Sequence, residues 1–412
     1  MIGMPDVLVP ARFNRGAILR AADWLAVAVA VTLPWSTTAT GICIALWLIA
    51  TLASLDPRML RRELASAAAF LPVMLWVVAA IGMLWADAAW AERLAGLNKF
   101  HRLLFIPLLF VQFRQSGNGI RVLYGFMASV LALLVVSWGL AVIPGLPWRG
   151  RLVGVPTKDY IFQSANFLIC AFALLGCAGE AARKQLWRSV AGYAAVSVLF
   201  LANIVFVVSS RTALIVAPVL LLLLGWRQFG WKGLVGTSLL GAIAAGAIWF
   251  GSPYLHDRLL TSVQEFEAYR KDDAANPTGL HLEFMRKSLG FVETAPIIGH
   301  GTGSIPEQFR LAAAGKSGEA SATLSANPHN QILAVGIQLG LVGVAVLVAM
   351  WIAHLLLFAG GGLAAWFGLI VVAQNMVFSL FNSHLFDFTS GWLYVFGVGV
   401  IGGMVLRERD SV

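Results

Sequence analysis

The chain has 412 residues, of which 59% are hydrophobic and 12% are charged, and its formal net charge is +9. Because a soluble domain carries about 25% charged residues, this composition excludes a protein whose surface is mostly in water. It predicts an all-α, polytopic membrane protein. Membrane orientation explains the basic excess, since Lys and Arg gather in cytoplasmic loops, and we expect no nucleic-acid partner.

Apolar runs near 20 residues in length mark candidate membrane spans, and these runs account for most of the chain. In chain order they are 18–34, 37–55, 64–86, 100–113, 119–144, 160–179, 188–209, 212–226, 232–251, 331–357, 361–382 and 388–406. We therefore predict about twelve transmembrane helices. The first nine occupy residues 1–251, and the last three occupy residues 331–412, on either side of a loop at 252–330.

Alternate connections between the predicted spans, together with both ends of the chain, carry short basic segments. Their cations are Arg12, Arg15, Arg20, Arg58, Arg61, Arg62, Arg114, Arg121, Arg183, Lys184, Arg188, Arg227, Lys232, Arg407 and Arg409. By the positive-inside rule these segments and both termini lie in the cytoplasm, as an even number of spans requires. The expected location is a bacterial inner membrane, with the other face in the periplasm.

The loop 252–330 is the longest polar segment and lies on the expected periplasmic face. Apolar residues recur at helical spacing between Leu255 and Phe266, and again between Leu280 and Val292. A connection of this length is usually functional. The sequence therefore predicts a large helical loop that covers the periplasmic end of the bundle.

Ionisable groups beside apolar segments are functional candidates, because a charge near lipid is costly. Three stand out on the expected periplasmic face, namely Arg211, Arg286 and His329. Arginine offers a planar donor fork for phosphate, and a neutral imidazole accepts a proton near pH 7. Each also has a simpler explanation: a snorkelling anchor for the first, a solvated helix face for the second and an interfacial side chain for the third.

Weaker candidates lie on the same expected face. Substrate contacts are expected from Lys287, Lys99, His101, Arg102 and Asn330, and a basic rim for an anionic acceptor from Arg149, Arg151 and Lys158. Interfacial anchoring explains most of these cations equally well. Three glycines in the segment APIIGHGTGSIP, at positions 299, 301 and 303, predict a tight turn whose N–H groups approach an anion.

No motif for a nucleotide, a metal or a cofactor is present. The glycine-rich segment lacks the Gly-Lys-Ser or Gly-Lys-Thr of a phosphate-binding loop and follows no predicted strand. Cys43, Cys170 and Cys177 lie inside apolar runs without Cys/His metal spacing, and no Asp-x-Asp occurs. We therefore expect neither a metal ion nor a cofactor.

Three local motifs resemble the O-antigen ligase and polymerase superfamily of polytopic membrane glycosyltransferases. They are Ser210-Arg211-Thr212, Arg286 followed by Pro296 to Gly303, and Pro328-His329-Asn330 to Leu333 followed by Gly340-Leu341-Val342-Gly343. Their order and approximate spacing match across residues 188–345, and the hydropathy matches over the whole chain. Each motif alone is weak, whereas the three in order are fairly specific to the superfamily.

The resemblance implies an inverting, metal-independent O-antigen ligase. Such an enzyme moves a polysaccharide from undecaprenyl diphosphate to lipid A–core in the periplasmic leaflet. Arg211 and Arg286 would stabilise the leaving diphosphate, and His329 would deprotonate the acceptor hydroxyl. An O-antigen polymerase and a protein O-oligosaccharyltransferase are alternatives within the superfamily. A lipid-linked glycan transporter is the non-enzymatic alternative, and the scarcity of charge inside the predicted spans disfavours it.

Overall fold

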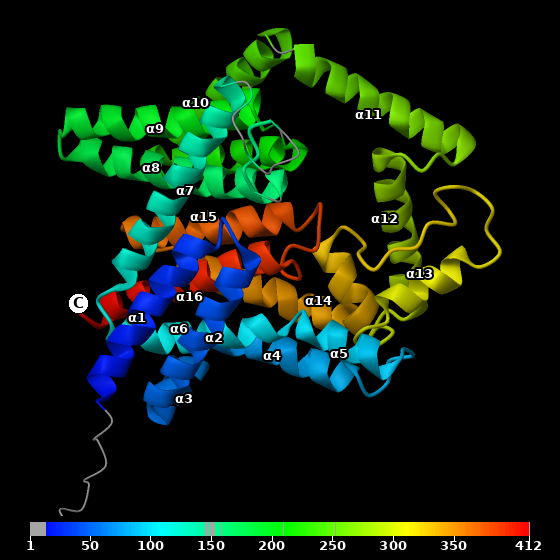
Figure 1. The fold of residues 1–412 in the computed structure, drawn as a ribbon, viewed down its shortest axis with the longest axis horizontal. Helices are drawn as coiled ribbons and strands as arrows, with labels where there is room; N and C mark the ends of the chain where they lie inside the picture. The colour runs from blue at the N-terminus through cyan, green and yellow to red at the C-terminus, as the bar shows by residue number, and fades with distance from the viewer. Residues whose placement is uncertain are drawn as a thin grey trace, which may run out of the picture.

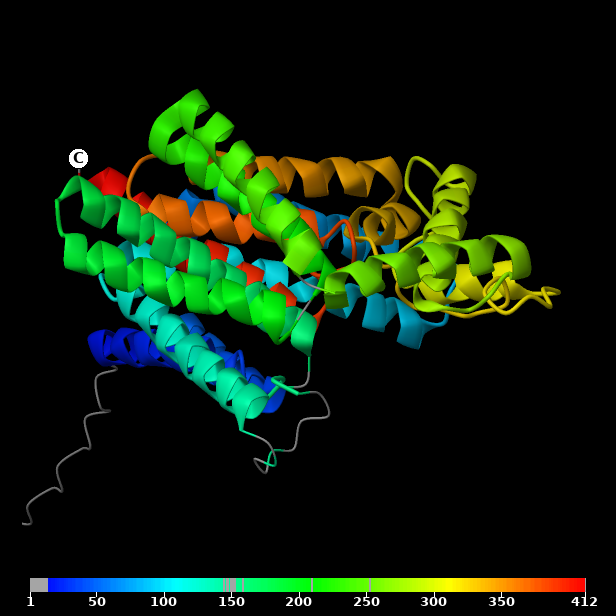
Figure 2. The same cartoon turned by 90° about the horizontal axis from the view of Figure 1, so that it is seen from above.

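The computed structural model describes residues 14–143, 145, 148, 153–157, 159–208, 210–251 and 253–411. Over these residues the chain forms sixteen α-helices and one short 3-10 helix, and no strand. This confirms the predicted all-α class. Most of the helices pack side by side in an elongated bundle, and a smaller group projects from one end (Figures 1 and 2).

The bundle is formed by thirteen α-helices and the 3-10 helix. These are α1 (Arg15–Thr32), α2 (Thr37–Ser54), α3 (Pro57–Leu64), α4 (Ala67–Gly82), α5 (Trp90–Asn98), η1 (His101–Leu104), α6 (Phe105–Gln115), α7 (Gly119–Val142), α8 (Tyr160–Arg183), α9 (Trp187–Phe206), α10 (Arg211–Gly251), α14 (Gln331–Leu357), α15 (Leu363–Phe378) and α16 (Phe388–Asp410). Helices α8 and α16 are mostly buried, whereas α2, α7 and α9 leave most of their apolar surface exposed. Exposed apolar faces at the periphery suit contact with lipid.

The number of membrane spans depends on how bent helices are counted. Seven of the described helices are individually long and apolar enough to cross a membrane, and nine qualify if each of two bent pairs forms one span. The predicted eighth and ninth spans are merged in α10, which bends sharply at Gly230 (φ 60°, ψ −142°). A Cβ on Gly233 would overlap the backbone of Gly225, so the two arms fold back closely on each other. A multi-pass membrane protein is supported, and the count of twelve stays a prediction.

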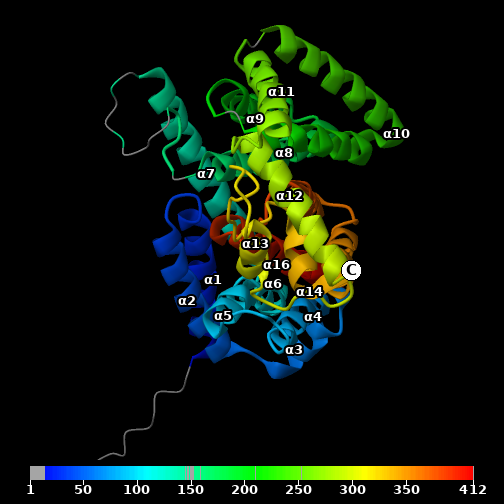
Figure 3. The same cartoon turned by 90° about the vertical axis from the view of Figure 1, so that its right-hand side faces the viewer.

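The projecting group comprises α11 (Pro253–Asp272), α12 (Pro277–Thr294) and α13 (Ile305–Ala313), and we call residues 253–330 the lobe. Figure 3 looks onto this end of the molecule. The two helical patterns expected in the loop correspond to α11 and α12. Helix α13 was not expected, because its short apolar face rests mainly on two residues, Ile305 and Phe309, which are buried. The proposed division into residues 1–251, 252–330 and 331–412 stays a prediction.

The glycine-rich turn fastens the lobe to the bundle. The N–H of Gly301 donates to the carbonyl of Gln338 (2.9 Å), and the N–H of Gly303 donates to the side-chain oxygen of the same residue (2.8 Å). The N–H of Thr302 donates to the carbonyl of Gly82 in α4 (3.0 Å). The expectation that these N–H groups approach an anion is therefore wrong, because protein acceptors already occupy them.

A matching break in α14 provides the acceptors for this turn. The helix is interrupted at Gly340 (φ 60°, ψ −159°), which frees the carbonyl of Gln338 from its helical hydrogen bond. The turn glycines have positive φ, and a Cβ on Gly301 would collide with Ala86. Glycine is thus required for close backbone approach, and the turn sets where the lobe meets the bundle.

Candidate functional site

His329 lies where the lobe returns to the bundle, just before α14. Its backbone is left-handed (φ 53°), and its N–H donates to the side-chain oxygen of Asn327 (2.9 Å). The next residue, Asn330, caps α14 by accepting from the N–H of Leu333 (3.1 Å). A left-handed histidine is uncommon, so these flanking hydrogen bonds fix the backbone from which the imidazole projects.

Helix α12 packs directly against the His329 ring. The ring of Phe284 stacks on it with 5.8 Å between centroids and 10° between planes, and the His281 ring lies 5.8 Å away. Phe284 also packs edge-on against Phe309 of α13, at 5.5 Å. Helix α12, which is distant from His329 in sequence and also carries Arg286, therefore covers one side of the His329 ring.

Arg286 is held at the surface of α12 by a buried carboxylate. Its guanidinium donates to both oxygens of Glu283, at 2.6 and 2.8 Å, and its side chain is 67% exposed. Burial alone would raise the pKa of Glu283, but hydrogen bonds from Arg286 and from the Tyr269 hydroxyl (2.7 Å) lower this pKa. The hydrogen bond to Glu283 in turn raises the pKa of Arg286, so this site keeps its positive charge.

Arg286 projects from a different face of α12 than Phe284, because helical residues advance by about 100° each. Among the described residues no hydrogen bond or ion pair joins its side chain to His329. The structure thus brings α12 to His329 and leaves the guanidinium facing solvent. Direct convergence of Arg286 on His329 stays a prediction.

Lys287 is committed to the interior of the lobe. Its ammonium donates to the carbonyl of Ser321 (2.6 Å) and lies 3.7 Å from Glu283. The residue is buried, and burial lowers the pKa of its ammonium group. These contacts favour a role in folding the lobe, and a substrate contact for Lys287 stays a prediction.

A polar cluster in the turn between α15 and α16 adjoins His329. Asn382 lies close enough to the His329 ring to raise its pKa and donates to Asp387 (3.2 Å), and the Nδ1 atom of His384 lies 3.2 Å from the same carboxylate. The sequence analysis assigned this turn no role. A signal was present, because His384-x-x-Asp387 places two ionisable groups between apolar runs, where such groups are costly.

The predicted cations near residue 100 lie against this turn and the start of α16. Arg102 is buried, its guanidinium donates to the backbone carbonyl of Asp387, and it lies 5.8 Å from the centre of the Trp392 ring. Lys99 lies 5.9 Å from the Phe386 ring, and His101 contacts the carbonyl of Asn98. Arg102 therefore supports the turn from beneath, while substrate contact by any of the three stays a prediction.

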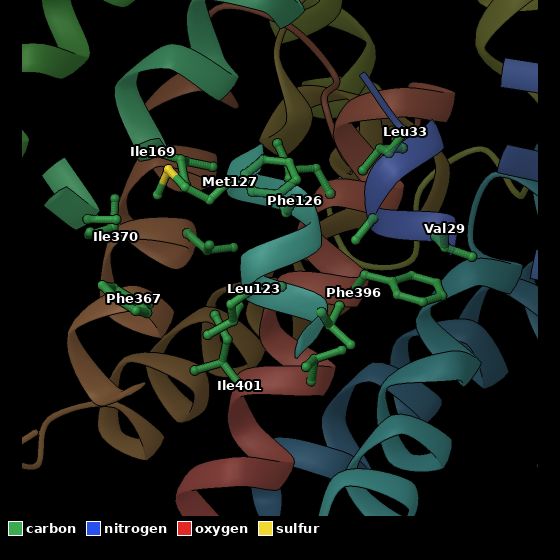
Figure 4. Close-up of a pocket in the computed structure, with 17 residues that line it drawn as sticks. Val29, Leu33, Leu123, Phe126, Met127, Ile169, Phe367, Ile370, Phe396 and Ile401 are labelled. Carbon is green, nitrogen blue, oxygen red and sulfur yellow. The ribbon is translucent and has the colours of Figure 1, made fainter. Parts of the chain in front are cut away.

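An apolar cavity lies between α1, α7, α8, α15 and α16 (Figure 4). Its lining is aliphatic and aromatic throughout and includes Leu33, Phe126, Met127, Ile169, Val371 and Phe396. A second pocket shares Ile169, Val371 and Leu393 with it and extends to His384 and Ser390. The two pockets therefore adjoin, with the apolar cavity on one side of these three residues and the pocket that reaches His384 on the other.

Two amides in the second pocket have buried oxygens without a protein partner. They are Gln374 and Asn375 at the end of α15, and the structure shows no hydrogen bond for either side-chain oxygen among the described residues. Buried polar atoms are rarely left unsatisfied. The pocket thus offers hydrogen-bonding capacity to a polar ligand beside the apolar cavity.

Arg211 begins α10 and has an exposed side chain. The preceding Ser210 is buried, and the carbonyl of Val208 accepts from the hydroxyl of Ser164 near the start of α8 (3.3 Å). The first residues of α8 line the second pocket, so Arg211 lies at the same end of the bundle as that pocket. The described residues show no hydrogen bond or ion pair between Arg211 and either Arg286 or His329.

The remaining predicted residues fall outside the described part of the chain. Arg149, Arg151 and Lys158 are the basic rim of the sequence analysis, and the structure does not describe them. Among the residues that it does describe, no group of three or more His, Cys, Asp or Glu side chains is arranged to hold a metal ion.

Comparison with known proteins places this arrangement in a class. Residues 195–348, which include Arg211, Arg286 and His329, match a family model described as O-antigen ligase. A search of curated proteins gives no match. The helices support a multi-pass membrane protein, and the matched family is one of glycosyltransferase-like enzymes. Within that class, the match confirms the resemblance to the O-antigen ligase superfamily.

Proposed function

We propose that this protein is an O-antigen ligase that transfers polysaccharide from undecaprenyl diphosphate to lipid A–core at the periplasmic face of the inner membrane. The observation that carries the proposal is the adjacency of an apolar cavity to a pocket that reaches His384, in the polar turn beside His329. A polyprenyl chain suits the apolar part, and sugars or phosphates suit the polar end. Both termini would then lie in the cytoplasm.

The chemical problem is a diphosphate leaving group at a lipid–water boundary. His329 takes the proton from an acceptor hydroxyl, and the resulting oxygen attacks the anomeric carbon of the donor. The bond from that carbon to the diphosphate oxygen breaks, the configuration inverts, and undecaprenyl diphosphate leaves. Arg211 and Arg286 stabilise the charge that grows on the leaving phosphate, so no metal is required.

The polar cluster positions the base in this mechanism. Asn382 lies between the His329 ring and Asp387, to which it donates, and Arg102 donates to the backbone carbonyl of Asp387. A hydrogen-bonded partner fixes the orientation of an imidazole, which is how a third group assists a general base. Asn382 and Asp387 are thus positioning residues that act through His329.

The rate of transfer should depend on pH through His329. Burial lowers the pKa of the His329 ring below the ordinary 6.5, although the nearby Asp387 opposes this shift. The neutral ring, which is the active base, predominates at pH 7, so kcat/KM should fall only as the pH drops below about 6.5. An Asp387→Asn variant should lower the pKa further and move this acid limb to lower pH. The test is kcat/KM between pH 5 and 8, normalised to each plateau; a limb that does not move contradicts the assignment.

A polymerase is the second candidate, since the family match covers the superfamily and does not separate its members. In that case the acceptor is another lipid-linked glycan instead of lipid A–core. The two pockets and His329 would serve both reactions. Among the described residues α11–α13 form the one projecting lobe, which favours the ligase, because polymerases of the superfamily carry two arginine-rich periplasmic loops.

The direct experiment uses purified full-length protein in lipid nanodiscs. Undecaprenyl-diphosphate-linked glycan and lipid A–core are added without nucleotide and with a chelator, and products are separated by mass. Transfer of glycan to lipid A–core, unaffected by chelation, supports the ligase. Growth of the glycan on its undecaprenyl carrier would identify a polymerase, and a requirement for added metal would contradict the proposed role of the arginines.

A further inference from the structure

A separate cavity, distinct from the two pockets described above, lies at the opposite end of the bundle, near the C-terminal ends of α8 and α14. Its volume is about 560 Å³, and its lining residues come from α8, α10, α14, α15 and the loop 359–362. Nothing in the proposed transfer reaction uses this cavity. It faces the leaflet that the basic segments place on the cytoplasmic side.

Two guanidinium groups line this cavity. Arg227 donates from Nη2 to the carbonyls of Gly360 (3.1 Å) and Gly362 (2.8 Å), and it lies 5.7 Å from the centre of the Trp366 ring. Arg183 donates to the side-chain oxygen of Gln228 (2.5 Å). Arg227 is therefore held at the cavity by neutral partners, whereas Arg183 has both a neutral partner and, at 3.5 Å, the carboxylate of Glu180. Among the described contacts of Arg227, its Nη1 and Nε atoms remain available to a ligand.

The charges around the cavity do not balance. Among its described lining residues, Arg183 and Arg227 are cationic and Glu180 alone is acidic. Glu180 lies 3.5 Å from Arg183 and also 3.5 Å from Lys184, so two cations already share its charge. A positive surplus remains beside lipid, where an unneutralised charge is costly, and an anionic group would remove this cost.

The shape of the cavity admits a headgroup together with part of a chain. Gly360, Gly361 and Gly362 have open space where a Cβ would be, so the loop leaves room beside the guanidinium groups. Leu223, Leu355 and Leu369, from three different helices, provide an apolar side. A cavity with a basic end and an apolar side between membrane helices is the arrangement that recognises anionic lipid headgroups.

We propose that this cavity binds the phosphodiester group of an anionic membrane lipid, with the phosphate between Arg183 and Arg227 and an acyl chain along the three leucines. Two guanidinium groups suit a phosphate because each offers paired N–H donors. The aromatic ring of Trp366 fixes the plane of Arg227, and its own N–H donates to the carbonyl of Phe172 (2.9 Å). The site is thus preorganised before a lipid enters.

The test measures lipid retention by the full-length protein. Purified protein is incubated with equal amounts of phosphatidylglycerol and phosphatidylcholine, and bound lipid is measured by native mass spectrometry. Wild-type protein should retain phosphatidylglycerol preferentially. Because each basic side chain near a lipid surface contributes about fivefold in affinity, Arg183→Gln and Arg227→Gln should each weaken retention about fivefold, and the double variant about 30-fold.

Matched controls separate the site from general basicity. Arg188→Gln removes a cation from the same end of the bundle that does not line the cavity, so it should leave retention unchanged. If Arg227→Gln fails to fold, the exposed Arg183 still gives a valid single test. Millimolar inorganic phosphate should not displace the lipid. Displacement would show a site for a free anion, and equal retention by wild type and the double variant would likewise overturn the proposal.

Discussion

Replacing His329 with asparagine should reduce glycosyl transfer about 100- to 10,000-fold, the range that a general base contributes. Asparagine tolerates the left-handed backbone at this position better than most residues, so the start of α14 should keep its structure. It retains a polar side chain beside Asn382 and cannot accept the proton of a hydroxyl near pH 7. The measurement is kcat/KM for transfer to lipid A–core, with the melting temperature as a check of folding.

His281 provides a comparison for this variant. Its ring lies 5.8 Å from His329 and outside the Asn382–Asp387 cluster. A His281→Asn variant should lose far less activity than His329→Asn, since the mechanism gives it no proton to accept. Comparable losses at both positions would instead indicate that the aromatic packing beneath α12 matters, and that His329 is not the base.

Replacing Arg286 with alanine should reduce transfer about 100- to 1000-fold, because it removes a preorganised donor from the leaving diphosphate. Lysine at this position keeps the charge and loses the paired donors, so its loss should be smaller. Arg211→Ala should show a loss of the same order as Arg286→Ala. In each case kcat/KM should fall while the protein stays folded, as measured by its melting temperature.

The lobe contains a matched control for Arg286. Arg310 on α13 is 63% exposed and pairs with Glu307 three residues earlier, as Arg286 pairs with Glu283. Exposed ion pairs of this kind contribute little to stability, so Arg310→Ala should leave activity within about twofold. Tyr269→Phe removes a different partner of Glu283, at 2.7 Å. If Tyr269→Phe lowers activity as far as Arg286→Ala does, the arginine acts through the fold of the lobe and not on the substrate.

Local patterns in the sequence predicted the helices well, because each apolar run determines its own helix. The sequence predicted two helices on either side of Gly230, and α10 does bend sharply at that residue, although its two arms form one continuous element. The short helix α13 was missed because its burial depends on Phe284 of α12, a contact between segments that the sequence does not relate. The glycines at 299, 301 and 303 were recognised as a tight turn, but their role depends on acceptors in α4 and α14 that only the fold brings near.

The sequence predicted only part of the candidate site, because contacts between distant segments are not visible in local patterns. Individual residues such as His329 stood out because ionisable groups beside apolar runs are rare. Their neighbours depend on packing: Phe284 covers His329 from the lobe, and Asn382 reaches it from the turn before α16. The apolar cavity combines side chains from five helices, each of which resembles ordinary core in sequence. Such a cavity becomes visible only once the helices are assembled.

The central claim is that the acceptor is lipid A–core. The most direct test is to analyse the lipopolysaccharide of a bacterial strain that lacks this protein. The glycans are examined by gel electrophoresis and mass spectrometry, with the wild-type gene restored as a control. The ligase account predicts complete core without attached polysaccharide, together with long polymer accumulated on undecaprenyl diphosphate. Core that carries a single repeat unit would show a missing polymerase and contradict the account.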